Sequence, residues 1–372
     1  MPFDDMRAFL SCLEEKGQLS KVMREINGDS YDISIILDEL SKRSGKAVLF
    51  ENIRKYSIPM CANTLGTLKR ISMALETTEE ELSYEWRKRR LSSWPAPVDV
   101  SDGPCKEMII RREQVDLYKY PILKWNPLDA GPYITLGVLI TNDPETRIRN
   151  AGIYRMMVQG KNQLGISMLK QKHITAHYEK AQAKGEPLDA AVVIGLDPTI
   201  VLAAATRLKF GEDELAFAGA LRKEAVKVTA CETVDIDVPA SAELVIEGRI
   251  PPGTRAMEGP FGESTGYYDL GGYMPIMRIE TITQRQNPIY QATHTGKPIK
   301  EEHVITSISA GEDYRSVGSI FRALSRGAMG QATNGIRGRL GLIRMRLMDK
   351  PIRFPRKDIE RVTRNWNEYG LD

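Results

Sequence analysis

The chain has 372 residues, with 42% hydrophobic and 27% charged residues and a formal net charge of +3. These values are ordinary for a globular protein of two or three domains, and so small a charge gives no reason to expect a nucleic-acid partner. No apolar run reaches membrane-spanning length, and the N-terminus lacks the regions of a signal peptide. The four cysteines form no C-x-x-C pair, so we expect a cytoplasmic protein without a disulfide framework or zinc ribbon.

Residues 1–95 predict a small N-terminal α+β segment. Its pattern indicates a helix over 3–15, a short strand over 46–53 and two helices within 67–90. The last of these helices ends in the basic run WRKRR, which suits the helix dipole and indicates a solvated helix end. Residues 92–106 are rich in Pro and Gly and predict a linker.

The middle of the chain, 96–300, is rich in strands, with helices between them. The expected elements are a hairpin around Asn-Asp-Pro over 133–160, a helix over 171–187, a strand, turn and buried helix over 189–206, a helix over 211–225, and extended runs over 226–250 and 275–296. This order predicts an α+β protein with a barrel-like core. The tail, 301–372, is basic and ends in a helix over 357–369, which suits a small docking element.

Two histidines, His173 and His177, stand four residues apart on a predicted helix and could face one metal ion. Ile174 occupies the position of the glutamate in H-E-x-x-H, so a zinc hydrolase is disfavoured. The alternative is a structural histidine on an amphipathic helix. Glu214 belongs to an acidic run that opens the next helix, where the dipole alone would favour carboxylates.

The stretch EGPFGE places Glu258 and Glu263 on either side of a Gly-Pro-Phe-Gly turn. This spacing separates the two side chains on a helix and puts them on opposite faces of a strand, so only an irregular turn brings them together. Carboxylates that meet beside Phe261 can take different pKa values and act as acid and base. The alternative is an acidic surface loop.

Arg155 lies in an apolar run, directly before Met156 and Met157. A buried arginine needs a partner, and the planar guanidinium fits a carboxylate, so Glu258 or Glu263 would serve. The alternative is a strand arginine that reaches solvent at the edge of a sheet.

Several motifs occur in a fixed order along the chain. They are NAGIYR (150–155), KH (172–173), GEDELAFAGAL (211–221), VTACETVDIDVPASAELVIEG (228–248), EGPFGESTGY (258–267) and the final IERVTRNWNEYG. In this order they resemble the UbiD family of prenylated-flavin decarboxylases. EGPFGE with a following Gly-Tyr is the most specific of them.

The resemblance implies that Asn150, His173 and Glu214 hold a divalent metal, typically Mn²⁺, against the phosphate of prenylated FMN, with K⁺ common nearby. An amide oxygen, an imidazole and a carboxylate are a donor set that suits Mn²⁺. The further cofactor-binding residues that it implies are Ile153, Tyr154, Arg155, Lys172 and Thr206, with Arg207, His294 and Thr295 near the cofactor.

The same resemblance implies a Glu-Arg-Glu network of Arg155, Glu258 and Glu263. Arg155 would keep Glu258 ionised, and Glu263 would act as the proton donor. The implied reaction is the reversible non-oxidative decarboxylation of an α,β-unsaturated or aromatic carboxylic acid through an adduct with prenylated FMN. The implied partners are that small-molecule acid, a flavin prenyltransferase that supplies the cofactor, and further copies of the chain in a homodimer or higher homo-oligomer.

The implied fold is α+β, with a split β-barrel flavin-binding domain over 96–300, the N-terminal α+β segment and a C-terminal α/β region. This sequence departs from the family pattern in two ways. Lys172 stands where many relatives carry an uncharged polar residue, and the chain is short after Gly296. The region 301–372 is therefore expected to be a reduced oligomerisation domain, in which Arg326 would replace a phosphate-binding residue. This shortening motivates an alternative, a non-catalytic or auxiliary subunit. A hydrolase that uses the two carboxylates is the third possibility.

Overall fold

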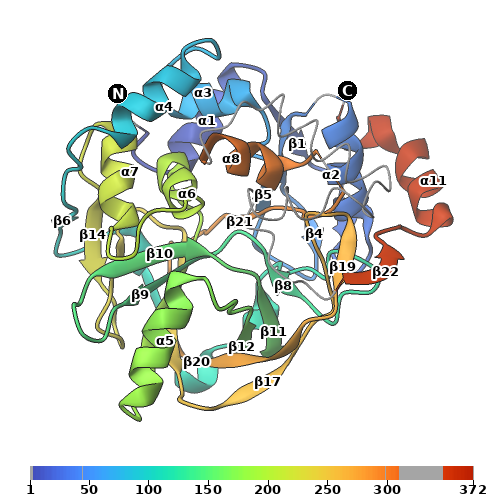
Figure 1. Ribbon diagram of the computed structural model, residues 1–372. Coiled ribbons are helices and arrows are strands. Elements are labelled where there is room, and N and C mark those ends of the chain that lie inside the picture. The colour runs from blue at the N-terminus through green and yellow to red at the C-terminus, as the bar shows by residue number, and fades with distance from the viewer. Residues whose placement is uncertain (1–2, 44, 298, 310–346, 372) are drawn as a thin grey trace.

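The computed structural model describes residues 3–43, 45–297, 299–309 and 347–371. In Figure 1, a large curved sheet fills the lower half of the molecule, and the N-terminal elements lie above it. None of the helices in these ranges is long and apolar enough to cross a membrane. The predicted Arg326 lies outside the described residues.

The N-terminal unit, residues 3–90 as far as they are described, combines four helices with a small sheet. Its elements are α1 (Met6–Glu15), β1 (Leu19–Val22), β2 (Ile26–Asn27), α2 (Asp32–Lys42), β3 (Ala47–Phe50), β4 (Ile53–Arg54), β5 (Met60–Ala62), α3 (Leu68–Ala74) and α4 (Leu82–Arg90). Helix α1 begins where the Asp5 side chain accepts a hydrogen bond from the Ala8 amide. Its buried residues, Met6, Phe9, Leu10 and Leu13, recur at the spacing of one helix face.

The small sheet has the strand order β1-β3-β5-β21. Its last strand, β21 (Tyr290–Ala292), pairs parallel with β5 although it lies far along the chain. The N-terminal unit is therefore completed by residues that follow the large sheet in sequence.

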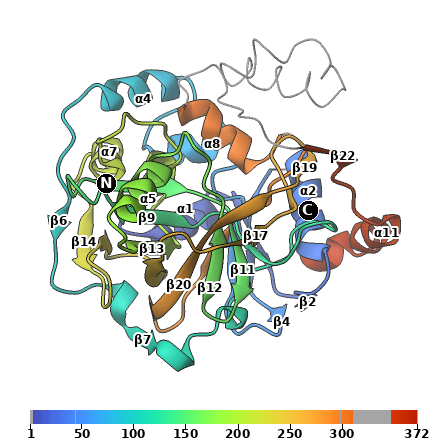
Figure 2. The ribbon, with the colours of Figure 1, turned by 60° about the horizontal axis from the view of Figure 1, so that its bottom comes forward.

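The large sheet has the strand order β10-β9-β13-β16-β20-β12-β11-β8, and β17 and β7 also pair with β20. Its strands are β7 (Met108–Arg111), β8 (Tyr133–Ile134), β9 (Val138–Asn142), β10 (Arg149–Ile153), β11 (Met156–Gly160), β12 (Gln163–Ile166), β13 (Leu188–Ile194), β16 (Leu244–Ile250), β17 (Arg255–Glu258) and β20 (Gly272–Gln284). The neighbouring strands β20, β12 and β11 can be followed in Figure 2. The sheet curls into a half-barrel, and the predicted mixture of α and β structure is confirmed.

Both faces of this sheet are covered, which explains why β13 is apolar along most of its length. Val192 and Ile194 belong to the core on one face, and Ala191 and Val193 belong to the core on the other. Three helices follow strands of the sheet: α5 (His173–Ala183), α6 (Pro198–Ala204) and α7 (Glu214–Arg222). All three pack against β10, the strand that carries Asn150.

Two further small sheets flank this core. One has the order β15-β14-β6 and the other β18-β19-β22. Their strands are β6 (Val98–Asp99), β14 (Lys227–Ala230), β15 (Asp237–Pro239), β18 (Phe261–Gly262), β19 (Tyr267–Asp269) and β22 (Leu347–Pro351), and the short 3-10 turns are η1 (Pro104–Lys106), η2 (Arg112–Gln114) and η3 (Leu117–Lys119). The prediction of a linker over 92–106 is wrong for β6, because this strand pairs with β14.

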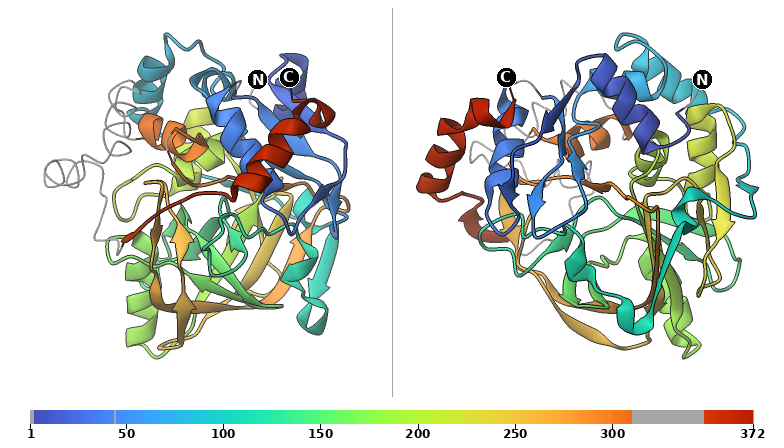
Figure 3. Two further views of the ribbon diagram at one scale, coloured as in Figure 1. Left: turned by 90° about the vertical axis from the view of Figure 1, so that its right-hand side faces the viewer. Right: turned by 180° about the vertical axis from the view of Figure 1, so that it is seen from behind.

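Four elements are described after β21: strand β22, already named, and α8 (Glu301–Ser309), α11 (Arg356–Arg364) and η5 (Trp366–Tyr369). Helix α11 packs beside α2, as Figure 3 shows, and Arg361 forms an ion pair with Asp32. The predicted helix over 357–369 is shorter than expected, because its last turn is the 3-10 element η5.

Candidate active site

The side chain of Arg155 is at the centre of a buried cluster of carboxylates. It follows β10 and is 9% exposed. Its Nε and Nη2 atoms donate to the two carboxylate oxygens of Glu258 at 3.0 and 2.8 Å. Its Nη1 atom pairs with Glu263, and Nη2 also donates to Asp269 at 2.8 Å. The edge-strand alternative for Arg155 is therefore wrong.

The turn between Glu258 and Glu263 explains how the two side chains converge. Glu258 ends β17, and the chain turns at Gly259 before it enters β18. Gly259 has a φ angle of +95°, and a Cβ atom there would lie 2.7 Å from the Cα of Gly271. Only glycine fits this position. Glu258 is completely buried, so the alternative of an acidic surface loop is wrong.

One guanidinium thus faces three carboxylates. This excess of acidic groups favours the protonated form of Glu263. Burial raises the pKa of Glu263, and Arg155 opposes this rise, while the nearby negative charges of Asp269 and Glu258 add to it. Burial disfavours the charged form of Arg155, but the surrounding carboxylates keep its pKa well above the usual value. The cluster can therefore hold a proton on Glu263 while Arg155 stays charged.

Asp269 was not predicted from the sequence. It lies on β19, directly opposite Phe261 in the antiparallel pair β18–β19. The ring of Phe261 lies beneath the Arg155 guanidinium, 5.3 Å from its Cζ atom. The pairing of these two short strands brings Asp269 to Arg155, and no motif in the sequence signals that register.

The residues predicted to bind metal begin with Asn150 and Glu214, which are 4% and 3% exposed. Glu214 opens α7 and accepts a hydrogen bond from the Ala151 amide at 2.8 Å. Burial raises the pKa of Glu214 to about 8, and the backbone amides oppose this effect. No ion pair to Glu214 is found among the described residues.

His173 is the first residue of α5, and its ring packs edge-on against Phe210 at 5.4 Å. Burial lowers the pKa of His173, as do the positive charges of Arg207 and Lys172. Because α5 and α7 both pack against β10, the structure places His173, Asn150 and Glu214 on three adjoining elements. No hydrogen bond between the imidazole and the other two is found in the described ranges.

Groups of three or more His, Cys, Asp or Glu residues that could hold a metal ion are not found in the described part of the chain. The predicted set contains only two residues of these types, because its third member is an asparagine. His177 is buried against the same Phe210 ring, and its Nδ1 atom lies 2.9 Å from the hydroxyl of Thr141.

Lys172 interacts electrostatically with Glu263 of the Arg155 cluster and with His173 of the predicted metal residues. Burial lowers its pKa, Arg207 lowers it further, and Glu263 opposes both effects. The Lys172 amine is 6.0 Å from the ring of Tyr154, whose own pKa is raised by burial to about 12. One cation therefore lies within electrostatic range of both the Arg155 cluster and the His173 region.

Three further residues were predicted to bind or adjoin the cofactor: Ile153, Thr206 and His294. Ile153 is half-buried at the end of β10, and the Thr206 hydroxyl donates to the Leu202 carbonyl at 2.7 Å. His294 is buried with its Nε2 atom 3.2 Å from the side-chain oxygen of Asn126, and burial lowers its pKa to about 3.

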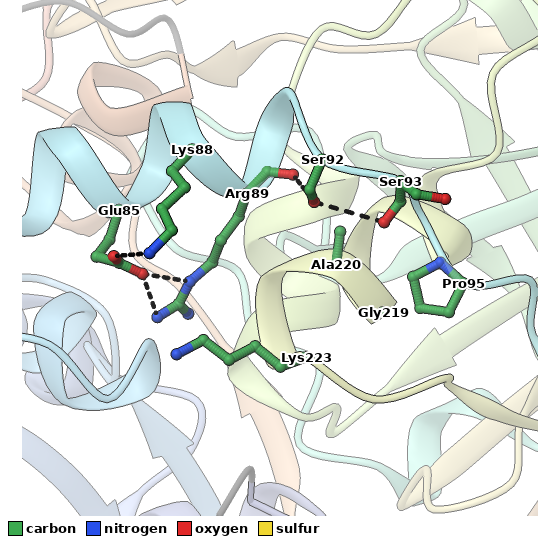
Figure 4. A pocket seen from close by; sticks show the side chains of 9 residues that line it. All are labelled: Glu85, Lys88, Arg89, Ser92, Ser93, Pro95, Gly219, Ala220 and Lys223. Atoms are coloured by element: carbon green, nitrogen blue, oxygen red, sulfur yellow. Dashed lines mark hydrogen bonds and ion pairs between the residues drawn. The ribbon is translucent and has the colours of Figure 1, made fainter.

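A hollow of about 320 Å³ lies between α4 and the C-terminal end of α7 (Figure 4). Its charged groups are largely paired, because Glu85 binds both Lys88 and Arg89. Arg89 is only 5% exposed and donates to the Leu221 carbonyl at 2.6 Å. The prediction that WRKRR is a solvated helix end is therefore wrong for Arg89, which joins α4 to α7.

Comparisons with known proteins identify the family. Residues 96–298 match the 3-octaprenyl-4-hydroxybenzoate carboxy-lyase Rift-related domain, named UbiD, and residues 10–89 match its N-terminal domain. The chain belongs to the UbiD family. An uncharacterized protein of Archaeoglobus fulgidus is 40% identical over 322 residues, which are 81% of this chain and 66% of that protein. The chain thus spans just under two thirds of this relative.

Two solved structures are also similar to this UbiD-family chain. An evolved dimeric form of the UbiD-class enzyme HmfF from Pelotomaculum thermopropionicum, in complex with prFMN, is 34% identical with a TM-score of 0.78, and the match covers 82% of this chain and 71% of that one. The closed form of vanillic acid decarboxylase from Sedimentibacter hydroxybenzoicus is 30% identical with a TM-score of 0.80, and the match covers 83% and 68%.

Proposed function

We propose that this chain is a prenylated-FMN-dependent carboxy-lyase that reversibly and non-oxidatively decarboxylates an α,β-unsaturated or aromatic carboxylic acid. The observation that carries the proposal is the buried cluster in which Arg155 binds Glu258 and Glu263. Its place in a family named for a carboxy-lyase supports it, as does the complex of the similar HmfF enzyme with prFMN.

The residues on β10, α5 and α7 fit a metal-bound flavin phosphate. Glu214 lacks a cationic partner among the described residues, so its ionised form is costly unless a cation joins it. Asn150 and His173 would complete an oxygen and nitrogen donor set that suits Mn²⁺. Lys172 and Arg207 supply positive charge for a phosphate, and a K⁺ ion beside the same phosphate belongs to this proposal. Ile153, Tyr154 and Thr206 would line the cofactor.

Prenylated FMN, when bound, supplies the electron sink that makes the loss of carbon dioxide possible. The protein supplies orientation and a proton. Arg155 binds Glu258 through two hydrogen bonds, and this pair fixes the guanidinium that also holds Glu263. Glu263 carries the proton on a carboxylate oxygen, because burial and two neighbouring carboxylates raise its pKa. It donates this proton to the carbon that has lost carbon dioxide, and it takes the proton back in the reverse direction.

The organisation of the protein is part of the same proposal. The domains are the N-terminal segment 1–95, the flavin-binding domain 96–300 and the C-terminal region 301–372. The working state is a homodimer or higher homo-oligomer in the cytoplasm, and a flavin prenyltransferase supplies the cofactor.

The test is to express the protein together with a flavin prenyltransferase and to measure the absorption spectrum, bound mass and carbon dioxide release from a panel of unsaturated and aromatic acids. We expect Glu263→Gln to bind the cofactor but to release carbon dioxide about 10²–10⁴-fold more slowly. Glu360→Gln, whose side chain is 55% exposed on α11, is the matched control and should behave as wild type.

Two results would contradict the proposal. Wild-type turnover by Glu263→Gln would exclude this residue as the proton donor. A folded protein that takes up no flavin, but gains activity with a complete homologue, would favour an auxiliary subunit of a UbiD-like complex.

A further inference from the structure

We propose that His303 is a positioning residue that holds Glu263 in place by donating a hydrogen bond to the backbone carbonyl of Ser264. The catalytic meaning of this contact rests on the proposed function, in which Glu263 delivers the proton. The Nε2 atom of His303 lies 2.7 Å from the Ser264 oxygen, one residue after Glu263.

The hydrogen bonds of the imidazole determine which of its nitrogens carries the hydrogen. The backbone amide of Lys300 donates to Nδ1 of His303 at 3.0 Å, so Nδ1 is the acceptor. A neutral imidazole then carries its hydrogen on Nε2 and donates it to the Ser264 carbonyl. Burial favours this neutral ring, because it lowers the pKa of His303 to about 4.

The EGPFGE loop is bound by two different segments of the chain, and Glu263 lies where the contacts pass from one segment to the other. The first half is bound by residues 126–133: the Ala130 amide donates to Pro260, and Asp129 accepts from the Gly262 amide at 2.8 Å. The second half and Ser264 are bound by residues 295–303, which include the start of α8. The Thr295 hydroxyl donates to the Gly262 carbonyl at 2.7 Å, and His303 binds the carbonyl of Ser264. The carbonyls of Gly262 and Ser264, the residues on either side of Glu263, are thus both bound by residues 295–303.

The start of α8 is itself fastened to the N-terminal unit. Glu301 accepts the amides of Asn63 and Leu65 at 3.1 and 2.6 Å. The buried Lys300 amine donates to Asp38 of α2 at 2.7 Å. The start of α8 is thus bound to the N-terminal unit, and His303 binds this helix to the loop that carries Glu263.

Such a contact matters because a proton donor must stay within hydrogen-bond reach of the reacting carbon. The test compares His303→Gln with His303→Met. The Gln side chain can place an N–H group near the position of Nε2, whereas Met fills the space and cannot donate. Ser307→Ala is the control on the same helix, because the Val304 carbonyl is the only partner of the Ser307 hydroxyl within the described ranges.

Two measurements are made on each protein. Amide hydrogen exchange, read by mass spectrometry, should be faster over residues 262–267 in His303→Met than in wild type, and unchanged in His303→Gln and Ser307→Ala. In the cofactor-loaded enzyme, kcat of His303→Met should fall by roughly 10–100-fold with KM unchanged, because small displacements of a catalytic group have effects of this size. His303→Gln should recover most of that loss.

Unchanged exchange over 262–267 in His303→Met would overturn the proposal, and so would a His303→Gln variant as impaired as His303→Met. If wild type releases no carbon dioxide from any acid, the proposed function fails. The exchange measurement still decides the role of His303 in that case, because it needs no turnover.

Discussion

Two regions of this protein bury carboxylates, and they balance the negative charge in different ways. Glu258 is completely buried and lies against Arg155, which binds both of its oxygens. Glu214 is almost as buried, but the described contact of its carboxylate is the Ala151 amide. In the first region, the positive charge that balances the carboxylates comes from a side chain of the protein, Arg155. The second has no cationic partner among the described residues, which is the arrangement that the proposed metal site requires.

The largest effect should come from removing the internal cation. Arg155→Met leaves Glu258, Glu263 and Asp269 together without a positive partner. Loss of one member of a buried ion pair costs about 3–5 kcal/mol. We expect the free energy of unfolding in urea at neutral pH to fall by this amount. Arg155→Lys should lose less, since it keeps the charge but not the planar fork. A Met variant as stable as wild type would show that this cluster needs no internal cation.

An intermediate effect should come from adding the external cation. At one hundred times its dissociation constant, a bound ion stabilises the folded state by about 2.7 kcal/mol. We expect Mn²⁺ to raise the thermal midpoint of the metal-free protein and to have no such effect on Glu214→Gln. Glu212→Gln, two residues earlier, is the control that should keep the response. An equal Mn²⁺ shift in Glu214→Gln would place the metal elsewhere.

The smallest effect should come from changing the balance within the Arg155 cluster. Burial raises the pKa of Glu263, and the charge of Asp269 adds to the rise. The proposed function requires Glu263 to donate in its protonated form, so activity should fall as pH rises through this pKa. Asp269→Asn lowers the pKa, so the loss of activity should move to lower pH in a profile of kcat against pH. Asp235→Asn, whose side chain is 84% exposed, should leave the profile unchanged. A shift to higher pH in Asp269→Asn would contradict this account.

Much of the secondary structure was predictable because its signals are local. The acidic run opens α7 and the Asn-Asp-Pro turn separates β9 from β10, as the sequence predicted. The structure adds that Asp213 caps α7 by accepting from the Leu215 amide. The burial of Arg89 was not predictable, because it depends on the Leu221 carbonyl of a distant helix. The short strand β6 was missed for the same reason: its pairing with β14 gives it its place.

The candidate site also contains residues that were predictable from the sequence and residues that were not. The convergence of Arg155, Glu258 and Glu263 was predictable, because a buried guanidinium needs carboxylates and the glycine-rich turn supplies two. Asp269 and His303 were missed. Their places depend on the register of β18 with β19 and on the packing of α8 against the EGPFGE loop. Neither relationship has a short-range signal in the sequence. The roles of the metal and cofactor residues stay predictions.

The return of the chain to its first sheet has a consequence for synthesis of the protein. Strand β5 ends at Ala62, but its parallel partner β21 begins only at Tyr290. At a translation rate of about 5–20 residues per second, β21 is synthesised roughly 10–45 s after β5. During that interval the main-chain hydrogen-bonding groups of β5 on that side are a template for other chains. A ribosome-bound fragment that ends before Tyr290 should therefore depend on chaperones more than one that includes β21.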